Sequence, residues 1–590
     1  MAWYDEAVFY HIYPLGLTGA PFENPYGDPV HRLRDIFPWI DHIKNIGCNA
    51  IYIGPLFESV GHGYETTDYK KLDSRLGDNR DLTDFVKECH AQGIRVILDG
   101  VFNHTGRDFF AFQDIKKNRE NSQYKDWYCN VNFWGNNEYN DGFSYDNWGG
   151  YNLLVKLNQR NPAVRDYILD VVRFWVSEFD IDGIRLDAAD VLDFDFMKAL
   201  RGLANEVKPE FWLMGEVIHG DYTRWVNEGT LHSVTNYQLH KALYSGHNDH
   251  NYFEIAHTVK RLYDMGGNHP EGLKLYNFTD NHDVERIYTK LSNKAHYTPV
   301  HILEYTLPGV PSIYYGSEFG IEGKKEQWSD ASLRPCLKLS DYKDATINNP
   351  CTKLIAALGK VRQQVKALSY GDYNQLFLTN RQYAFSRNYN GDNVIVTVNN
   401  DDSDYTMTLP CGNATVYIGA LSGQEVSVNN GNICVNVKAN SGDIWIPKTE
   451  QIHLPDSSVY ETAQAPVSEA APVDTPATDS APCEASATNT DDTMQQTKTS
   501  DTDNAAQQTE ISDADNASQQ AETPVTDTAA QQAETPVTDN AEFERGKIAG
   551  LQEAIIAIME KNGYVTDQMR QDVYNNTHHD SLINWVKSFH

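Results

Sequence analysis

The chain has 590 residues, of which 82 are acidic and 49 are basic, so its formal net charge is −33. Its length predicts two to four domains rather than one, and its 40% hydrophobic content is enough to form at least one large core. The negative charge disfavours nucleic acids and anionic membranes as partners, because both would repel the chain.

The first residues lack the basic and apolar segments of a secretory signal, and no run of 18 apolar residues is present to cross a bilayer. The eight cysteines are scattered without the paired spacing of metal ligands. Buried thiols in a reducing compartment are the favoured interpretation. We therefore expect a cytoplasmic enzyme with no membrane partner.

Residues 1–364 alternate short β-type runs with longer amphipathic stretches. One of these stretches has Asn161 as a helix N-cap and Pro162 at the first helical position. Eight β-runs interleaved with helices predict a (β/α)8 TIM barrel, although a doubly wound open sheet would give a similar pattern. The predicted strands are 8–13, 50–54, 95–99, 183–186, 211–215, 233–235, 274–278 and 312–315.

Two further regions follow from changes in this pattern. From residue 102 to residue 156 the helical periodicity stops, and we interpret the segment as a small subdomain inserted after the third strand, because a structureless loop of that length is improbable. Residues 365–450 show short alternating runs separated by turns, which predicts an antiparallel β-sandwich. Its predicted strands are 384–388, 393–398, 405–409, 415–418, 433–437 and 443–446.

About half of the net negative charge lies in residues 451–541, which contain 17 acidic residues and one basic residue, Lys498. A Gln-Gln pair recurs there every twelve residues, and the composition cannot bury enough apolar surface to fold. A disordered, self-repelling acidic linker is predicted. Residues 542–590 regain apolar side chains at helical spacing and predict a small helical module, which would pair with itself or with an unidentified protein partner.

Four short polar runs follow the third, fourth, fifth and seventh predicted strands, where they would converge on one pocket. Each contains a carboxylate, two contain a histidine, and one has an arginine two residues before its aspartate. Such a group suits glycosyl transfer through a covalent intermediate, with the nucleophile and the acid/base about 5–5.5 Å apart if configuration is retained. The runs are 99–104, 183–188, 213–217 and 278–283.

Each of these residues also has a structural explanation. Asp99 could be a buried cap, His104 taken alone is more often a hydrogen-bonded structural histidine, and Arg185 with Asp187 could be an ordinary ion pair. Their joint order after successive strands favours a catalytic site instead. We expect Arg185 to keep its neighbouring carboxylate ionised, while crowding and burial keep the acid/base protonated.

In this order the four runs resemble the four short conserved regions of glycoside hydrolase family 13, the α-amylase family, over residues 1 to about 448. The resemblance implies that Asp187 is the nucleophile, Glu216 the acid/base and Asp283 the carboxylate that orients the sugar ring and supports the transition state. The remaining residues that it implies are Tyr64, which stacks beneath the sugar; His104, Arg185 and His282, which grip it; Asp330 and Arg334, a pair further along the glycone side; and Asp99 with Asn103, which support the site.

Residues 155–158, Val-Lys-Leu-Asn, are similar to the fifth family region of neopullulanases and cyclomaltodextrinases. The β-sandwich that usually precedes the barrel in that group is missing before the first predicted strand, so dimerisation through it is not expected. The Lys-His pair that supplies a backbone calcium ligand in many α-amylases is here Ala189-Asp190. We therefore expect no required cofactor and no metal, with Asn103 as the one candidate calcium ligand.

The leading hypothesis is a retaining hydrolase that cleaves α-1,4 glucosidic bonds in maltooligosaccharides, cyclodextrins or starch fragments, with α-1,6 cleavage left open. A 4-α-glucanotransferase would use the same covalent intermediate, and none of these residues decides between the two. A sugar-binding or scaffold protein without catalysis is disfavoured, because all three carboxylates are present. Aromatic residues of segment 102–156, including Trp134 and Trp148, are either stacking surfaces for sugars or the core of that subdomain.

Overall fold

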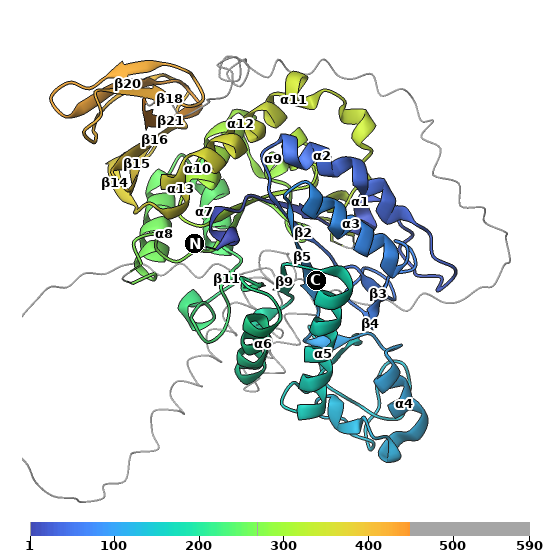
Figure 1. Ribbon diagram of the computed structural model, residues 1–590. Helices are drawn as coiled ribbons and strands as arrows, with labels where there is room; N and C mark the ends of the chain where they lie inside the picture. The colour runs from blue at the N-terminus through green and yellow to red at the C-terminus, as the bar shows by residue number, and fades with distance from the viewer. Residues whose placement is uncertain (1, 268, 328, 449–590) are drawn as a thin grey trace, which may run out of the picture. The chain divides into compact units, whose positions relative to one another are not determined.

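The structure is a computed structural model that describes residues 2–267, 269–327 and 329–448 (Figure 1). The predicted linker at 451–541 and helical module at 542–590 lie outside the described residues. None of the helices in the described ranges is long and apolar enough to cross a membrane.

Eight parallel strands form one sheet, in the order β11-β10-β9-β5-β2-β1-β13-β12. A parallel bridge between Thr235 and Tyr276 joins the two ends of this sheet, so the sheet curls into a nearly closed barrel rather than lying open. The predicted TIM barrel is therefore confirmed, and the open-sheet alternative is wrong. The strands are β1 (Phe9–Ile12), β2 (Ala50–Ile53), β5 (Arg95–Gly100), β9 (Gly183–Leu186), β10 (Trp212–Gly215), β11 (Ser233–Val234), β12 (Tyr276–Phe278) and β13 (Val310–Tyr314).

Alternate residues of these strands enter two different cores, because successive side chains point to opposite faces of a strand. Phe9 belongs to a cluster inside the barrel with Trp212, whereas its neighbour Tyr10 packs in the larger cluster shared with the helices. Both faces are buried, which explains why the strands are short, continuous apolar runs in the sequence.

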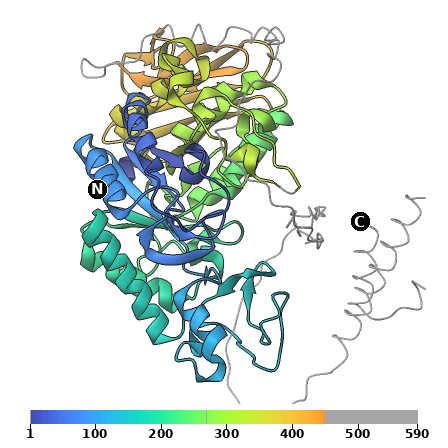
Figure 2. The ribbon, with the colours of Figure 1, turned by 90° about the vertical axis from the view of Figure 1, so that its right-hand side faces the viewer.

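Helices surround the strands, as two views of the ribbon show (Figure 1, Figure 2). The long helix predicted after Asn161 is α5, in which the Asn161 side chain accepts from the amide of Ala163 and Pro162 is the first helical residue. The other main helices are α2 (Phe37–Asn45), α3 (Asn79–Ala91), α6 (Phe194–Val207), α7 (Tyr237–Asn248), α8 (Tyr252–Asp264), α10 (Tyr297–Thr306) and α12 (Pro350–Gln364), with α5 at Pro162–Phe179. Short helices are α1 (Pro14–Leu17), α9 (Ile287–Lys290), α11 (Ala345–Asn348) and α13 (Lys366–Tyr370).

Two excursions leave the barrel at the carboxyl ends of its strands. After β2 comes an antiparallel hairpin of β3 (Phe57–Ser59) and β4 (Thr66–Leu72). After β5 the chain forms a three-stranded sheet in the order β6-β8-β7, together with α4 (Phe110–Asn118). Its strands are β6 (His104–Thr105), β7 (Asn147–Trp148) and β8 (Tyr151–Lys156).

The C-terminal part of the described chain consists of antiparallel sheets, as predicted. A six-stranded sheet has the order β14-β15-β16-β21-β18-β19, and β17 pairs with β20 in a second sheet. The prediction missed β14 and β19, which lie at the edges of the larger sheet and are only partly buried. The strands are β14 (Asn374–Leu378), β15 (Gln382–Tyr389), β16 (Asp392–Asn399), β17 (Tyr405–Pro410), β18 (Val416–Gly419), β19 (Glu425–Ser427), β20 (Asn432–Val437) and β21 (Ser441–Pro447).

Candidate active site

The barrel brings the four polar runs together at the carboxyl ends of β5, β9, β10 and β12. Asp99 of β5 is directly opposite Arg185 of β9 in the parallel ladder, and Met214 of β10 is opposite Arg185 on the other side. Asp187 is the first residue after β9, and Glu216 is the first residue after β10. Strand register alone therefore places an arginine in the middle of three carboxylates.

The guanidinium of Arg185 contacts all three of these carboxylates. Its Nη1 lies 2.9 Å from Asp99 Oδ1 and 2.9 Å from Asp187 Oδ1, and its Nη2 lies 2.9 Å from Glu216 Oε2. Arg185 and Asp99 are almost completely buried, and the Glu216 side chain is 14% exposed. Three carboxyl groups thus share one positive charge in a low-dielectric site.

Tyr64, His282 and Asp283 form the neighbouring part of the site. The Tyr64 hydroxyl donates to Asp99 Oδ2 at 3.2 Å and contacts His282 Nε2, and the two rings are stacked. His282 Nε2 is 3.1 Å from Asp283 Oδ2, whose side chain is 37% exposed. Asp283 is therefore the most accessible of the three predicted catalytic carboxylates.

Arg334 joins the predicted glycone pair to the same cluster. Its Nη2 is 2.9 Å from Asp283 Oδ1 and 3.1 Å from Asp330 Oδ2, while its Nε donates to the carbonyl of His282. The structure thus brings Asp330 and Arg334 to the predicted site.

His104 and Asn103 line the side formed by the insertion. His104 Nε2 donates to the carbonyl of Tyr64 at 3.2 Å, and Asn103 Nδ2 donates to His104 Nδ1 at 3.2 Å. The ring of Trp148, at the tip of the β7–β8 hairpin, lies 6.1 Å from the His104 ring and is 40% exposed. Every residue predicted for the site is therefore part of one connected group.

Sequence reasoning missed three residues of this group. The Tyr52 hydroxyl donates to Asp99 Oδ2 at 2.8 Å, and His11 stacks on the Tyr52 ring at 4.2 Å. The Tyr237 hydroxyl lies 3.4 Å from Glu216 Oε1 and accepts from Asn281 Nδ2. His11 and Tyr52 are each the last residue but one of a barrel strand. An aromatic ring within a strand is usually interpreted as core, so the position near the carboxyl end of the strand was the one signal that could have identified them.

Comparison with known proteins agrees with this geometry. The profile of the alpha-amylase catalytic domain matches residues 17–346. A cyclomaltodextrinase of Thermoanaerobacter pseudethanolicus is 32% identical over 429 residues, which cover 69% of this chain and 72% of the relative. This chain belongs to the alpha-amylase family. It is a glycoside hydrolase of that family.

Other relatives point to the same group within the alpha-amylase family. Neopullulanase 2 of Thermoactinomyces vulgaris is 29% identical, with 75% of this chain and 78% of the relative covered. A solved cyclomaltodextrinase structure superposes with a TM-score of 0.67 at 27% identity, covering 75% of this chain and 78% of the other. The resemblance to cyclomaltodextrinases and neopullulanases that residues 155–158 indicated is thus confirmed.

The charge distribution in this alpha-amylase family site separates the three catalytic candidates. Burial raises the pKa of the Glu216 carboxyl and Arg185 opposes it, while the charge of Asp283 raises it further. For Asp283, burial is outweighed by His282 and Arg334, and its pKa falls to about 2. Because burial lowers the pKa of His282 itself to about 3, Arg334 is the partner of Asp283 that is charged at neutral pH.

Arg185 favours the ionised form of Asp187, in the direction expected from the sequence, because its Nη1 donates to Asp187 Oδ1 at 2.9 Å and lowers the pKa of that carboxyl group. Burial raises the pKa of the Asp187 carboxyl well above its usual range, and Arg185 opposes this increase without cancelling it. Glu216 and Asp99 raise the same pKa further, because they are anions that compete for the one guanidinium. The carboxyl groups around Arg185 therefore bind and release protons as a coupled set.

Asn103 is the candidate calcium ligand from the sequence, and calcium binding there stays a prediction. Asn103 Oδ1 is buried without a hydrogen-bond partner, which is the one feature that a cation would explain. Calcium takes six to eight oxygen ligands, usually with carboxylates among them. Within the described ranges, ligand atoms from three His, Asp or Glu residues come together at His31, Asp78 and Asp81, where Asp81 is already paired with Arg34.

Proposed function

We propose that this protein hydrolyses α-1,4 glucosidic bonds, and also α-1,6 bonds, in maltooligosaccharides, cyclodextrins or starch fragments, with retention of configuration. The observation that carries this proposal is the contact of one buried guanidinium with Asp99, Asp187 and Glu216 beside an ionised Asp283. Such a group provides a nucleophile, a proton donor and a permanent anion around one bond. The cyclomaltodextrinase and neopullulanase relatives support the substrate class.

In the first step, Asp187 attacks the anomeric carbon while Glu216 gives its proton to the glycosidic oxygen, which leaves with the aglycone. A glycosyl ester of Asp187 forms, and Glu216 becomes a carboxylate. The raised pKa of Glu216 suits this role, because the group must hold a proton near neutral pH. The step requires that the proton shared by the carboxyl groups lies on Glu216 when Asp187 attacks.

In the second step, Glu216 removes a proton from water, and the resulting hydroxide displaces Asp187 from the anomeric carbon. Glu216 is then protonated again, and the free carboxylate of Asp187 returns. Asp283 has a pKa of about 2 and stays ionised throughout, so it stabilises the positive charge that develops on the sugar ring. His104, with a pKa lowered by burial to about 3, stays neutral, and it binds the sugar by exchanging the bond of its Nε2 to the Tyr64 carbonyl for one to a sugar hydroxyl.

The test is to incubate the protein with maltoheptaose, β-cyclodextrin and pullulan, and to resolve the products by chain length and anomeric configuration. We expect shorter α-configured sugars from the wild type and at least 10³-fold slower turnover by Asp187→Asn. The matched control is Asp195→Asn, because that side chain is 87% exposed on α6, and it should retain full turnover.

The proposal fails if wild type and Asp187→Asn are equally inert on all three substrates. Products longer than the starting sugar would instead identify a glucanotransferase, because the glycosyl ester would then pass to a sugar hydroxyl rather than to water. β-Configured first products would contradict the covalent intermediate.

A further inference from the structure

The loop that carries Tyr64 has little rigidity of its own. Residues 60–64 read Val-Gly-His-Gly-Tyr, and Gly63 has a φ of +101°, a conformation that other residues rarely adopt. At the end of this loop the Tyr64 hydroxyl must stay against Asp99 and His282. Two glycines in five residues leave the chain free to move, so contacts from outside the loop must hold it.

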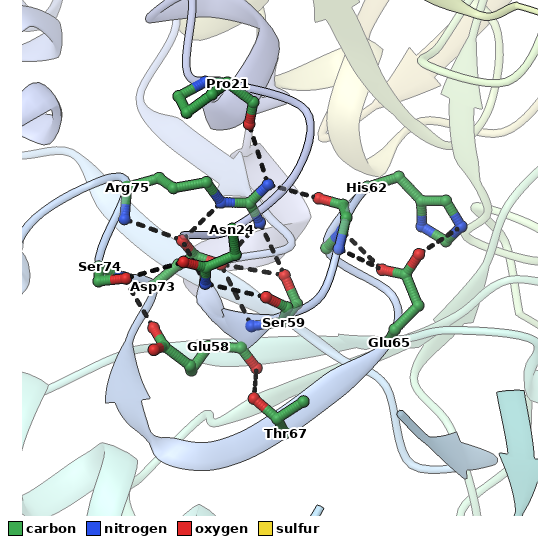
Figure 3. A network of polar contacts seen from close by, with 12 residues as sticks. Pro21, Asn24, Glu58, Ser59, His62, Glu65, Thr67, Asp73, Ser74 and Arg75 are labelled. Atoms are coloured by element: carbon green, nitrogen blue, oxygen red, sulfur yellow. Dashed lines mark hydrogen bonds and ion pairs between the residues drawn. The ribbon is translucent and has the colours of Figure 1, made fainter. Parts of the chain in front are cut away.

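Arg75, which follows β4, provides such contacts (Figure 3). Its side chain is 1% exposed and forms a two-point ion pair with Asp73, with Nε 2.8 Å from Oδ1 and Nη2 2.8 Å from Oδ2. Its remaining contacts are Nη1 to the carbonyl oxygens of Gly61 at 2.7 Å, Phe22 at 2.6 Å and Pro21 at 3.1 Å, and Nη2 to Ser59 Oγ at 2.9 Å.

These contacts join two separate loops to one side chain. The carbonyl of Gly61 belongs to the Tyr64 loop, and the carbonyls of Pro21 and Phe22 belong to the segment after α1. Asn24 of that segment adds two bonds to the same loop, since its amide donates to the Val60 carbonyl and its Nδ2 donates to the Ser59 carbonyl.

Two further residues outside segment 60–64, Glu65 and Tyr13, also hold the loop. Glu65 Oε2 accepts from the amides of Gly61 and Gly63, and Glu65 Oε1 is 3.1 Å from His62 Nε2. The Tyr13 hydroxyl donates to the His62 carbonyl at 2.6 Å. The Gly61 peptide is therefore fixed on both sides, its amide by Glu65 and its carbonyl by Arg75.

We infer that Arg75 is a positioning residue of the glycosidase site, which acts through the 60–64 loop to hold Tyr64 against Asp99 and His282. One guanidinium with all its donors engaged sets the position of the loop, because a side chain that is 1% exposed has almost no contact with solvent that could replace a lost bond. The inference rests on the proposed function in one respect, that Tyr64 contacts the sugar in the cleavage subsite.

The first test measures the loop without any substrate. Arg75→Lys keeps the charge, but one ammonium cannot contact Asp73, Ser59 and three carbonyls together. We expect hydrogen exchange of the amides in segment 59–66 to become at least tenfold faster in Arg75→Lys. The control is Arg387→Lys, since Arg387 is equally buried in β15, where it donates to carbonyls including that of Thr306, and its substitution should leave segment 59–66 unchanged.

The second test measures catalysis on whichever α-glucan the wild type cleaves. We expect Arg75→Lys to lower kcat/KM by 10- to 100-fold, since small displacements of a binding group have effects of this size. In a Tyr64→Ala background the same change should alter kcat/KM less than threefold, because the residue through which Arg75 acts is already absent. Arg387→Lys should stay within twofold of wild type.

Three results would overturn the inference. They are unchanged exchange of segment 59–66 in Arg75→Lys, an Arg75→Lys loss of the same size with and without Tyr64, and an equal loss of kcat/KM in Arg387→Lys. If Arg75→Lys does not fold, Ser59→Ala removes one bond of the set, and it should change exchange and kcat/KM in the same direction by two- to fivefold. A wild type inert on every α-glucan would refute the proposed substrate, but the exchange result would still decide the role of Arg75.

Discussion

Strand β9 has a buried aspartate beside each of its ends, and the charge balance around the two is opposite. Asp182, just before the strand, faces His90 Nε2 at 2.7 Å, Arg95 Nη1 at 2.9 Å and Lys208 Nζ at 2.9 Å. Asp187, just after it, shares the single guanidinium of Arg185 with two other carboxyl groups.

The difference appears in the pKa of each carboxyl group. For Asp182, burial is outweighed by the hydrogen bond of His90, the amide of Val96 and the charge of Lys208, so its pKa falls to about 2. For Asp187, burial and the neighbouring anions raise the pKa well above its usual range. At the amino end of β9, the excess of cations keeps Asp182 ionised, which contributes to stability. At the carboxyl end, the excess of carboxyl groups around Arg185 keeps a proton available for catalysis.

The largest effect should come from removing the proposed proton donor. We expect Glu216→Gln to lower kcat on maltoheptaose by 10³- to 10⁴-fold, because general acid catalysis is lost. On maltosyl fluoride, whose leaving group needs no proton, the loss of kcat/KM should be far smaller than on maltoheptaose, whereas kcat should stay low because Glu216 is also the base of the second step. Steady-state kinetics on both substrates check this, and equal losses of kcat/KM on the two would contradict the role of Glu216 as the acid.

A smaller but more specific effect is expected for Arg185→Lys. The planar guanidinium of Arg185 contacts three carboxylates, and the single ammonium of a lysine cannot do so. We therefore expect kcat/KM to fall by about 10²-fold. Because Arg185 opposes the rise in the pKa of Asp187, weakening it should move the acidic limb of the pH–rate profile to higher pH. Arg75→Lys should leave that limb in place, and a shift of equal size in both variants would refute the distinction between the two arginines.

At the amino end of β9 the expected effect is on stability alone. A carboxyl pKa lowered from 3.8 to about 2 corresponds to about 2 kcal/mol, which is present above the unfolded-state value and is lost as pH falls from about 4 towards 2. Asp182→Asn should therefore lower the free energy of unfolding by about this amount at pH 7, and by less at pH 3.5. Urea unfolding at both pH values checks this, with kcat expected to stay unchanged and Asp195→Asn as the exposed control.

The smallest effect is expected at the rim of the site. Trp148→Ala should raise KM for maltoheptaose about three- to tenfold with little change in kcat, because stacking of an aromatic ring contributes about 0.5–1.5 kcal/mol. Trp134→Ala is the matched control, since that ring is 99% exposed on the same insertion. Equal KM values in wild type and Trp148→Ala would show that Trp148 does not contact the sugar.

Much of the fold could be predicted because the barrel strands are buried on both faces and form continuous apolar runs. The predicted strand at 312–315 begins two residues later than β13, Val310–Tyr314, because a proline such as Pro311 disfavours a strand interior. In the structure Pro311 is nevertheless part of β13, opposite Asn277 of β12. The edge strands β14 and β19 were missed because half-exposed edges have no clear alternation.

For the site, the order of the polar runs was enough to group Asp187, Glu216 and Asp283 and to predict the raised pKa of Glu216, but not the rise in the pKa of Asp187. That rise depends on how many carboxyl groups surround Arg185, which is a matter of three-dimensional register. Arg75 was invisible for a similar reason, since its partners are mostly backbone carbonyls, which have no signature in a sequence.

One parallel bridge, between Thr235 and Tyr276, joins the two edges of the barrel sheet. The catalytic carboxylates lie on both sides of this junction. Glu216 belongs to the β10 side and Asp283 to the β12 side. Tyr237 connects the two sides, because its hydroxyl contacts Glu216 Oε1 and accepts a hydrogen bond from Asn281 Nδ2. A sugar that binds between Glu216 and Asp283 would therefore compete for the hydrogen bonds of the Tyr237 hydroxyl.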